Sequence, residues 1–159
     1  MSIFDNYALI AGLTAFFFTQ IVKVPIAYLM GRETSARLII STGGMPSSHS
    51  AGVTAVFTAL IIRYGIDSPL VAVSGILGTI VIYDAMNVRR QGGEQSILLR
   101  RLLTELQQTA VNEDFDNKER IMDLTKNMRP ISLGHKPSEV FIGIIVGALI
   151  AIALNYFFY

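Results

Sequence analysis

Four long apolar stretches, separated by polar connections, dominate the pattern of hydrophobic and polar positions along the chain. They cover about residues 7–29, 47–63, 69–86 and 138–158. A helix crosses a bilayer with roughly 17–25 mostly apolar residues, so each stretch is long enough to be a transmembrane helix. The pattern therefore predicts an all-α fold, an integral membrane helical bundle of about four transmembrane helices that forms a single domain over residues 1–159.

The connection between the third and fourth stretches, residues 87–134, is polar and has a helical pattern of its own. Leucines recur at helical spacing in "GEQSILLRRLLTELQQTAV", with arginines and glutamates between them. The later segment "DNKERIMDLTKNM" begins with an Asp/Asn capping signal and continues as a second short amphipathic pattern. We expect amphipathic cytoplasmic helices here, lying on the membrane surface or on each other. The alternative is an arm that recognises a partner.

Composition agrees with a membrane protein and excludes several other classes. Hydrophobic residues make up 52% of the chain and charged residues 16%, whereas roughly a quarter of residues are charged in ordinary soluble domains. The net charge of +1 gives no strong field that would favour nucleic acid. Because cysteine is absent, disulfides, thiolate metal ligands and a cysteine nucleophile are excluded. The N-terminus lacks a basic region and a cleavage site, so we expect it to be a retained first span.

Lysine and arginine are distributed very unevenly between the two ends of the predicted helices. Of the 13 Lys and Arg residues, only Lys23 and Arg63 lie outside the two large connections, residues 30–46 and 87–139. Cytoplasmic loops carry an excess of these residues. We therefore expect a multi-pass protein of the cell (plasma) membrane, with both connections in the cytoplasm and both termini outside.

With this topology, the unusual polar residues of the apolar stretches all fall at one end of the bundle. They are Lys23 in the first stretch, His49 at the start of the second, Asp84, Arg89 and Arg90 at the end of the third, and His135 and Glu139 at the start of the fourth. Ionisable groups inside a membrane are costly and usually face a bundle interior or a wet cavity. We therefore expect one shared site. Each residue taken alone has a simpler explanation. Lys23 could snorkel to the lipid headgroups, Asp84 and Arg89 could form a structural ion pair, and the histidines and other arginines could simply be solvated.

The stretch "GGMPSSHSAG", residues 43–52, indicates anion binding. Glycines such as Gly44 let the backbone approach a ligand closely, and the N-terminus of the following helix presents N–H groups and a positive dipole end. The hydroxyls of Ser47 and Ser48 add donors, and the nearby cations add positive charge. This set suits a phosphate, although the spacing is not that of a nucleotide-binding loop.

The two histidines suggest chemistry as well as binding. A neutral imidazole can attack phosphorus, and a second, protonated imidazole can protonate the leaving oxygen. His135 and Glu139 are four residues apart, so on a helix they would share a face, and the carboxylate could hold the imidazole tautomer. Pairing of Glu139 with Lys136 or Arg129 is the simpler alternative. The histidines are far apart in sequence and cysteine is absent, so we expect no metal and no other cofactor.

The stretches "GGMPSSHSA", "YDAMNVRRQGG" and "LGHKPSEVFIG" resemble the type 2 phosphatidic acid phosphatase superfamily, which also contains the vanadium-dependent haloperoxidases. The resemblance is closest to its divergent, YuiD-like branch of small membrane proteins and covers nearly the whole chain. It implies His135 as nucleophile with Glu139 supporting it, and His49 as general acid. It also implies phosphate binding by Lys23, Ser47 and Ser48.

The resemblance leaves the phosphate-binding arginine open among three residues. Arg129 stands six residues before His135, as the superfamily pattern requires, whereas Arg89 and Arg90 belong to the signature of the branch. We favour Arg89, then Arg90. The chain also departs from the superfamily pattern, with Ser48 in place of a glycine, glutamate in place of an aspartate, no Arg-Pro after the lysine, and four spans in place of six.

The sequence thus predicts a phosphoric monoester hydrolase of the membrane. Its expected substrate is a lipid phosphate, such as phosphatidylglycerophosphate or phosphatidic acid, cleaved through a phosphohistidine at the cytoplasmic face. The alternatives are a non-catalytic protein that binds or transports a lipid phosphate or anion and, less favoured, a vanadate-dependent haloperoxidase-like enzyme. The expected partners are the lipid substrate and membrane lipids, not nucleic acid. Gly143 and Gly147 permit close helix packing within the chain or in a homodimer.

Overall fold

The computed structural model describes residues 5–31, 44–110 and 134–159, and every regular element in these ranges is helical. The elements are α1 (Tyr7–Leu29), α2 (Ser48–Tyr64), α3 (Pro69–Tyr83), the π-helical turn η3 (Asp84–Val88), α4 (Arg89–Ala110) and α6 (Pro137–Phe158). The predicted all-α bundle is confirmed. The second amphipathic segment of the connection and Arg129 lie outside the described residues.

Three of the described helical segments are long and apolar enough to cross a membrane. They are Tyr7–Leu29, Pro69–Leu106 and Pro137–Phe158, which contain 18-residue stretches with mean hydropathies of 1.7, 1.7 and 2.4. The second predicted span is also a helix, but α2 has only 17 residues, the lower limit for spanning a bilayer. It packs against α1, α3 and α6 and is therefore the central helix of the bundle.

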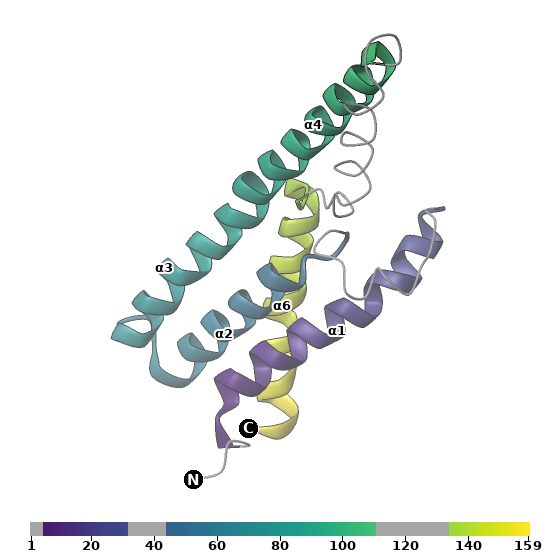
Figure 1. Ribbon diagram of the computed structural model, residues 1–159. Helices are drawn as coiled ribbons and strands as arrows, with labels where there is room; N and C mark the ends of the chain where they lie inside the picture. The colour runs from purple at the N-terminus through teal and green to yellow at the C-terminus, as the bar shows by residue number, and fades with distance from the viewer. Residues whose placement is uncertain (1–4, 32–43, 111–133) are drawn as a thin grey trace.

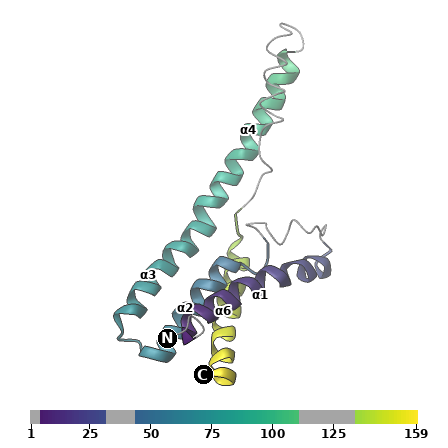
Figure 2. The ribbon, with the colours of Figure 1, turned by 60° about the horizontal axis from the view of Figure 1, so that its bottom comes forward.

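The helix that contains the third apolar stretch continues beyond that stretch. Helices α3, η3 and α4 form one continuous rod that extends beyond the rest of the bundle (Figures 1 and 2). The pair Gly92 and Gly93 lies inside this rod. Each glycine costs a helix about 1 kcal/mol relative to alanine, which is too little to end it without a proline or a competing cap. The leucines of α4 that the pattern singled out are mostly exposed.

Small side chains form the interior of the bundle, and large apolar side chains cover its outside. Ala11 and Ala15 of α1, Ala51 and Ala55 of α2, and Ala151 of α6 are fully buried. Large residues on the spanning helices, among them Phe17, Ile76 and Phe141, are exposed. Lipid solvates large apolar groups as well as a protein interior does, whereas small residues let helix backbones approach closely. This inverted arrangement is that of a membrane protein.

Helices α2 and α6 are in backbone contact at two glycines. A Cβ atom at Gly143 would lie 2.5 Å from the carbonyl oxygen of Ser47, and one at Gly147 would lie 2.8 Å from the Cα of Ala51. The sequence left open whether these glycines pack within the chain or between copies. They pack within the chain, so a second copy cannot use the same glycines while α2 covers them.

The start of α1 and the end of α6 lie at one end of the bundle (Figure 1). At this end the Tyr7 hydroxyl donates a hydrogen bond of 2.6 Å to the carbonyl of Ala151, which ties α1 to α6. The part of α1 around Lys23, the turn that leads into α2, η3 with the start of α4, and the segment that leads into α6 come together at the other end of the bundle. Apart from Arg129, the polar residues singled out in the sequence lie on these segments.

Candidate functional site

Helix α2 begins on a buried serine whose hydroxyl oxygen caps the helix. Ser47 is the N-cap, and its Oγ accepts hydrogen bonds from the N–H of Ser50 at 3.4 Å and from the Ser50 hydroxyl at 3.0 Å. The N–H of Ser47 donates to the carbonyl of Glu139 at 3.0 Å. Ser47 therefore fixes the start of α2 against the start of α6, and the hydrogen bond predicted from its hydroxyl to a phosphate stays a prediction.

The next serine is different. Ser48 is also completely buried, but its hydroxyl oxygen has no hydrogen-bond partner among the described residues. The N–H groups of Ser48 and His49 occupy the first helical turn, where N–H groups have no acceptor within the helix and lie at the positive end of its dipole. This turn thus presents several donors of the kind that a phosphate accepts.

The turn before α2 packs against the lysine of α1. Gly44 has φ of +95°, a conformation that favours glycine, and a Cβ there would lie 3.9 Å from the Cδ of Lys23. Lys23 is only 2% exposed, and the charge of Glu139 acts on it. A snorkelling lysine would keep its ammonium end exposed, so this alternative is wrong for Lys23.

His135 and Glu139 are in contact, although not through a shared helical face. His135 precedes α6 by two residues, and its N–H donates to the carbonyl of Ala85 in η3 at 3.1 Å. From there its Nδ1 lies 3.2 Å from Glu139 Oε2, an oxygen that also accepts the N–H of Lys136 at 3.2 Å. The segment before the helix thus folds back onto the first turn of α6.

The His135 ring leaves one nitrogen available. The residue is 1% exposed, and its Nε2 has no hydrogen-bond partner among the described residues. In the tautomer whose Nδ1 proton is donated to Glu139, Nε2 carries a lone pair. Buried polar atoms in folded proteins nearly always have a partner, and leaving one unmet costs about 1–3 kcal/mol. This nitrogen is therefore the atom of the ring that a ligand would contact.

The second histidine lies beside the first. The rings of His49 and His135 are 6.3 Å apart between centroids, with an interplanar angle of 63°. His49 also has a buried Nδ1 without a partner among the described residues. The groups whose charges act on its ring are Arg89, His135, Lys23 and Asp84. Because these come from α1, η3, α4 and the segment before α6, the predicted convergence of the polar residues is present in the structure.

Two residues of α1 were not among those predicted for the site. The Phe16 ring packs edge-on against His49, with centroids 5.9 Å apart. The buried Oε1 of Gln20 has no partner in the described part of the chain. Phe16, Gln20 and Lys23 are spaced four and three residues apart and so lie on one helical face. This spacing could have identified Gln20 from the sequence, but no sequence signal marks Phe16.

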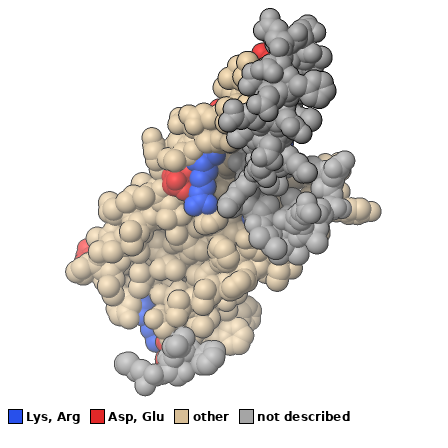
Figure 3. Space-filling model, viewed as in Figure 1, with Lys and Arg blue, Asp and Glu red and all other residues tan. Residues whose placement is uncertain are grey.

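The arginines lie where the π-helical turn joins α4. Arg89 Nε is 2.6 Å from Asp84 Oδ2, and Arg90 Nε is 3.1 Å from Glu94 Oε1. Both pairs are partly exposed, and Figure 3 shows adjoining blue and red side chains on a surface that is mostly uncharged. Ion pairs at this exposure contribute about 0–1 kcal/mol. Arg89 could therefore exchange Asp84 for a phosphate at small cost.

The backbone at this junction touches the segment before His135. A Cβ at Gly134 would lie 2.5 Å from the N of Arg90 and 2.8 Å from the C of Arg89. Single π-helical turns occur frequently at functional sites because they re-aim nearby groups. Here the turn supplies both the Asp84–Arg89 pair and the carbonyl that holds His135. The described residues contain no group of three or more His, Asp or Glu side chains that could hold a metal ion.

Residues 4–150 match the family described as the Divergent PAP2 family, a match that includes every candidate site residue from Lys23 to Glu139. The chain belongs to the divergent PAP2 family. It is also 42% identical to the uncharacterized membrane protein YuiD of Bacillus subtilis (strain 168), over 99% of this chain and 99% of that protein. No solved structure matches the chain significantly. This divergent PAP2 protein is thus a membrane protein with a possible relationship to phosphatases.

The structure separates the candidate residues of this divergent PAP2 protein into groups. Lys23, Ser48, His135 and Glu139 are buried in the site, His49 is half-buried beside His135, and Gly44 shapes the turn next to Lys23. Asp84 and Arg89 stand at its partly exposed edge, whereas the Arg90 side chain is turned to Glu94. Of the two candidate arginines that the structure describes, Arg89 and Arg90, the contacts favour Arg89 as the phosphate ligand.

Proposed function

We propose that this divergent PAP2 protein is a membrane phosphatase that hydrolyses a lipid phosphate. One observation carries the proposal. His135 is buried, with Nδ1 held by the Glu139 carboxylate, Nε2 without a partner among the described residues, and the second histidine ring 6.3 Å away. A nucleophile oriented by a third group, with an acid beside it, is the arrangement of covalent catalysis.

In the first step, the Nε2 lone pair of His135 attacks the phosphorus of the bound ester. The N–P bond forms as the bond between phosphorus and the lipid oxygen breaks. Protonated His49 gives its proton to that oxygen, so the lipid leaves as a neutral alcohol. The Glu139 carboxylate stabilises the positive charge that develops on the His135 ring, since it already contacts Nδ1.

In the second step, water cleaves the phosphohistidine. Neutral His49 takes a proton from the water as its oxygen attacks phosphorus, the N–P bond breaks, and inorganic phosphate leaves. Both histidines return to their starting protonation states. The same two rings therefore serve both half-reactions, which requires that both reach one phosphoryl group. A ring separation of 6.3 Å is compatible with contacts from different sides of a phosphate.

The negative charge of the transferring group needs fixed positive partners. Lys23, Arg89, the Ser48 hydroxyl and the N–H groups of the first turn of α2 are the donors that surround the two rings. Donors held in place before the reaction stabilise developing charge with little reorganisation, and a helix N-terminus adds its dipole. Burial strengthens each of these interactions relative to water.

The distribution of basic residues supports a cytoplasmic site. In chain order, the two connections that carry nearly all Lys and Arg join α1 to α2 and η3 to α6, and these elements bring the histidines together. We therefore place the site on the cytoplasmic side of the plasma membrane, with the termini outside. The substrates that suit this side are phosphatidylglycerophosphate and phosphatidic acid.

The test is phosphate release from a panel of lipid phosphates by the purified full-length protein, with and without a chelator. His135→Ala removes the nucleophile and should lower turnover on the order of 10³-fold or more. Arg63→Gln, which removes a charge at the other end of the bundle, should leave turnover unchanged. A brief reaction with ³²P-labelled substrate should also label wild-type protein, but not His135→Ala, in an acid-labile form.

Three results would contradict parts of the proposal. Turnover that persists in His135→Ala rejects the nucleophile. Turnover that disappears with chelator rejects a metal-free reaction. Lipid-phosphate binding without turnover across the panel favours the non-catalytic alternative, a binding or transport protein that uses the same site.

A further inference from the structure

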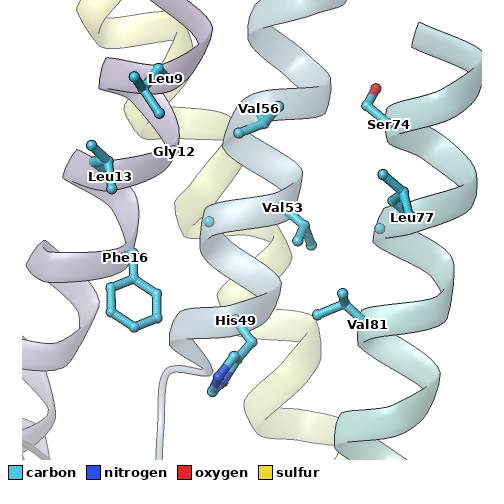
Figure 4. A pocket seen from close by; sticks show the side chains of 12 residues that line it. Leu9, Gly12, Leu13, Phe16, His49, Val53, Val56, Ser74, Leu77 and Val81 are labelled. Carbon is cyan, nitrogen blue, oxygen red and sulfur yellow. The ribbon is translucent and has the colours of Figure 1, made fainter. Parts of the chain in front are cut away.

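A second, apolar feature adjoins the polar site. A groove of about 430 Å³ runs between α1, α2 and α3. Figure 4 shows side chains from all three helices turned toward it, with His49 at one end. The larger apolar side chains that line it are Leu13, Phe16, Val53, Val56, Leu77 and Val81.

The size of the groove suits a hydrocarbon chain. On each helix its lining residues extend over about two helical turns, ~10 Å at 1.5 Å per residue. An apolar cavity of about 150 Å³ is large enough for benzene, so this groove can take a considerably longer alkyl segment. Its length is about a third of the ~30 Å hydrocarbon core of a bilayer, so the rest of a long chain would lie in lipid.

The groove is continuous with the polar site and with the outer surface of the bundle. His49 belongs to both, since it lines the groove and its ring lies 6.3 Å from that of His135. Leu9, Leu13 and Leu77 line the groove and are exposed on the surface that faces lipid in a membrane. A lipid whose phosphate contacts His49 could thus enter sideways from the bilayer, with a chain in the groove.

Small residues leave this space open. Gly12, Gly52, Ser74 and Gly78 form part of the groove wall. A Cβ at Gly78 would lie 3.8 Å from Val53, which is ordinary contact distance, so α2 and α3 are less tightly packed here than α2 and α6. Only Val71 and Gly78 of α3 are buried. The loose seam between α3 and the rest of the bundle is what keeps the groove accessible.

We propose that this groove binds the phosphate-proximal part of an acyl chain of the lipid substrate. The inference rests on the proposed phosphatase activity and specifies its substrate class as membrane-embedded lipid phosphates rather than water-soluble phosphate esters. Transfer of apolar surface out of water does not drive binding of the acyl chain, because the chain is already surrounded by lipid before it enters the groove. The groove instead aligns the phosphate with the two histidines, since chain and headgroup are covalently joined.

The first test compares a long and a short substrate. Ser74→Phe and Val81→Phe place a ring in the groove, whereas Ile76→Phe places the same ring on an exposed position of α3 that does not line it. The groove variants should lower kcat/KM for long-chain phosphatidic acid by about 10-fold to 100-fold, the scale of a misplaced substrate. The kcat/KM for glycerol 3-phosphate should change less than twofold, and Ile76→Phe should change neither. Equal losses on both substrates, or no loss on either, would overturn the role of the groove.

The second test does not depend on turnover. Wild-type protein in vesicles is photo-crosslinked with phosphatidic acid that carries a diazirine near the start of one acyl chain, and the labelled residues are mapped. Label should concentrate on residues 9–16, 49–56 and 74–81, and the groove variants that still fold should reduce it. Label spread evenly over the lipid-facing surface would reject the groove even if the protein is a phosphatase. Concentrated label without any phosphate release would retain the groove and reject the phosphatase.

Discussion

Gly143→Ala is the substitution that most directly tests how the two halves of the site are held together. The α2 half carries His49, and the α6 half carries His135 and Glu139. In the structure, a Cβ at position 143 would lie 2.5 Å from the carbonyl oxygen of Ser47 and 3.2 Å from the Cβ atoms of Ser47 and Ser50. The nearest atom belongs to the backbone, so no side-chain rotation can relieve the contact.

The size of the expected effect follows from these distances. Ordinary contact begins at 3.4 Å, so α2 and α6 must separate by about 1 Å at this point. Overpacking of this kind costs about 1–3 kcal/mol of folding free energy. The same movement would stretch the 3.0 Å hydrogen bond from Ser47 to the Glu139 carbonyl and shift the two histidines relative to each other. A displacement of 1 Å can lower an enzymatic rate about 10²-fold.

The assay is thermal unfolding and phosphate release of the purified protein in one detergent. The control is Gly92→Ala in α4, where a Cβ would meet no atom within 4 Å. That substitution should raise stability by about 0.5–1 kcal/mol, as expected for alanine in place of a helical glycine, and leave turnover unchanged. If Gly143→Ala were as stable and as active as Gly92→Ala, α2 and α6 would not touch at this glycine and the geometry of the site would have to be revised.

Two further substitutions test individual contacts. Ser47→Ala should lower the free energy of unfolding by about 1 kcal/mol because it removes the cap of α2. Ser48→Ala should leave the free energy of unfolding unchanged but weaken phosphate release and phosphate binding. The reverse pattern in unfolding and kinetic measurements would contradict these roles. Glu139→Gln keeps the shape of the side chain but removes the charge at His135 Nδ1, and turnover should fall by about 10²-fold to 10⁴-fold, on the scale of comparable substitutions in hydrolases. Unchanged turnover in Glu139→Gln would mean that the carboxylate serves only to cap α6.

The elements of the fold could be predicted because their causes are local. Inside a membrane each apolar stretch must form a helix, because a helix makes all its backbone hydrogen bonds within the segment. Residues such as Ser68 and Pro69 mark the start of a helix to within a few positions. The pattern did not show that the third apolar stretch and the following amphipathic segment form one continuous helix. The change from apolar to polar sequence after residue 86 marks the end of a hydrophobic stretch, not the end of a helix, and the chain continues helical through Gly92 and Gly93.

The sequence also determined the level at which the polar residues lie, because alternating spans bring Lys23, His49, His135 and Glu139 to the same end of the bundle. It did not determine which atoms meet. That His135 presents Nε2 while Glu139 holds Nδ1 depends on how far each helix is rotated and how closely its neighbours approach. The same holds for the Ser47 oxygen, which caps α2, and for the Ser48 hydroxyl, which has no partner among the described residues. Only the tertiary structure decided these points, as it decided the groove beside His49. Contacts between residues far apart in the chain follow from packing at particular small side chains, here Gly143 and Gly147 against α2, and not from the pattern of any one segment.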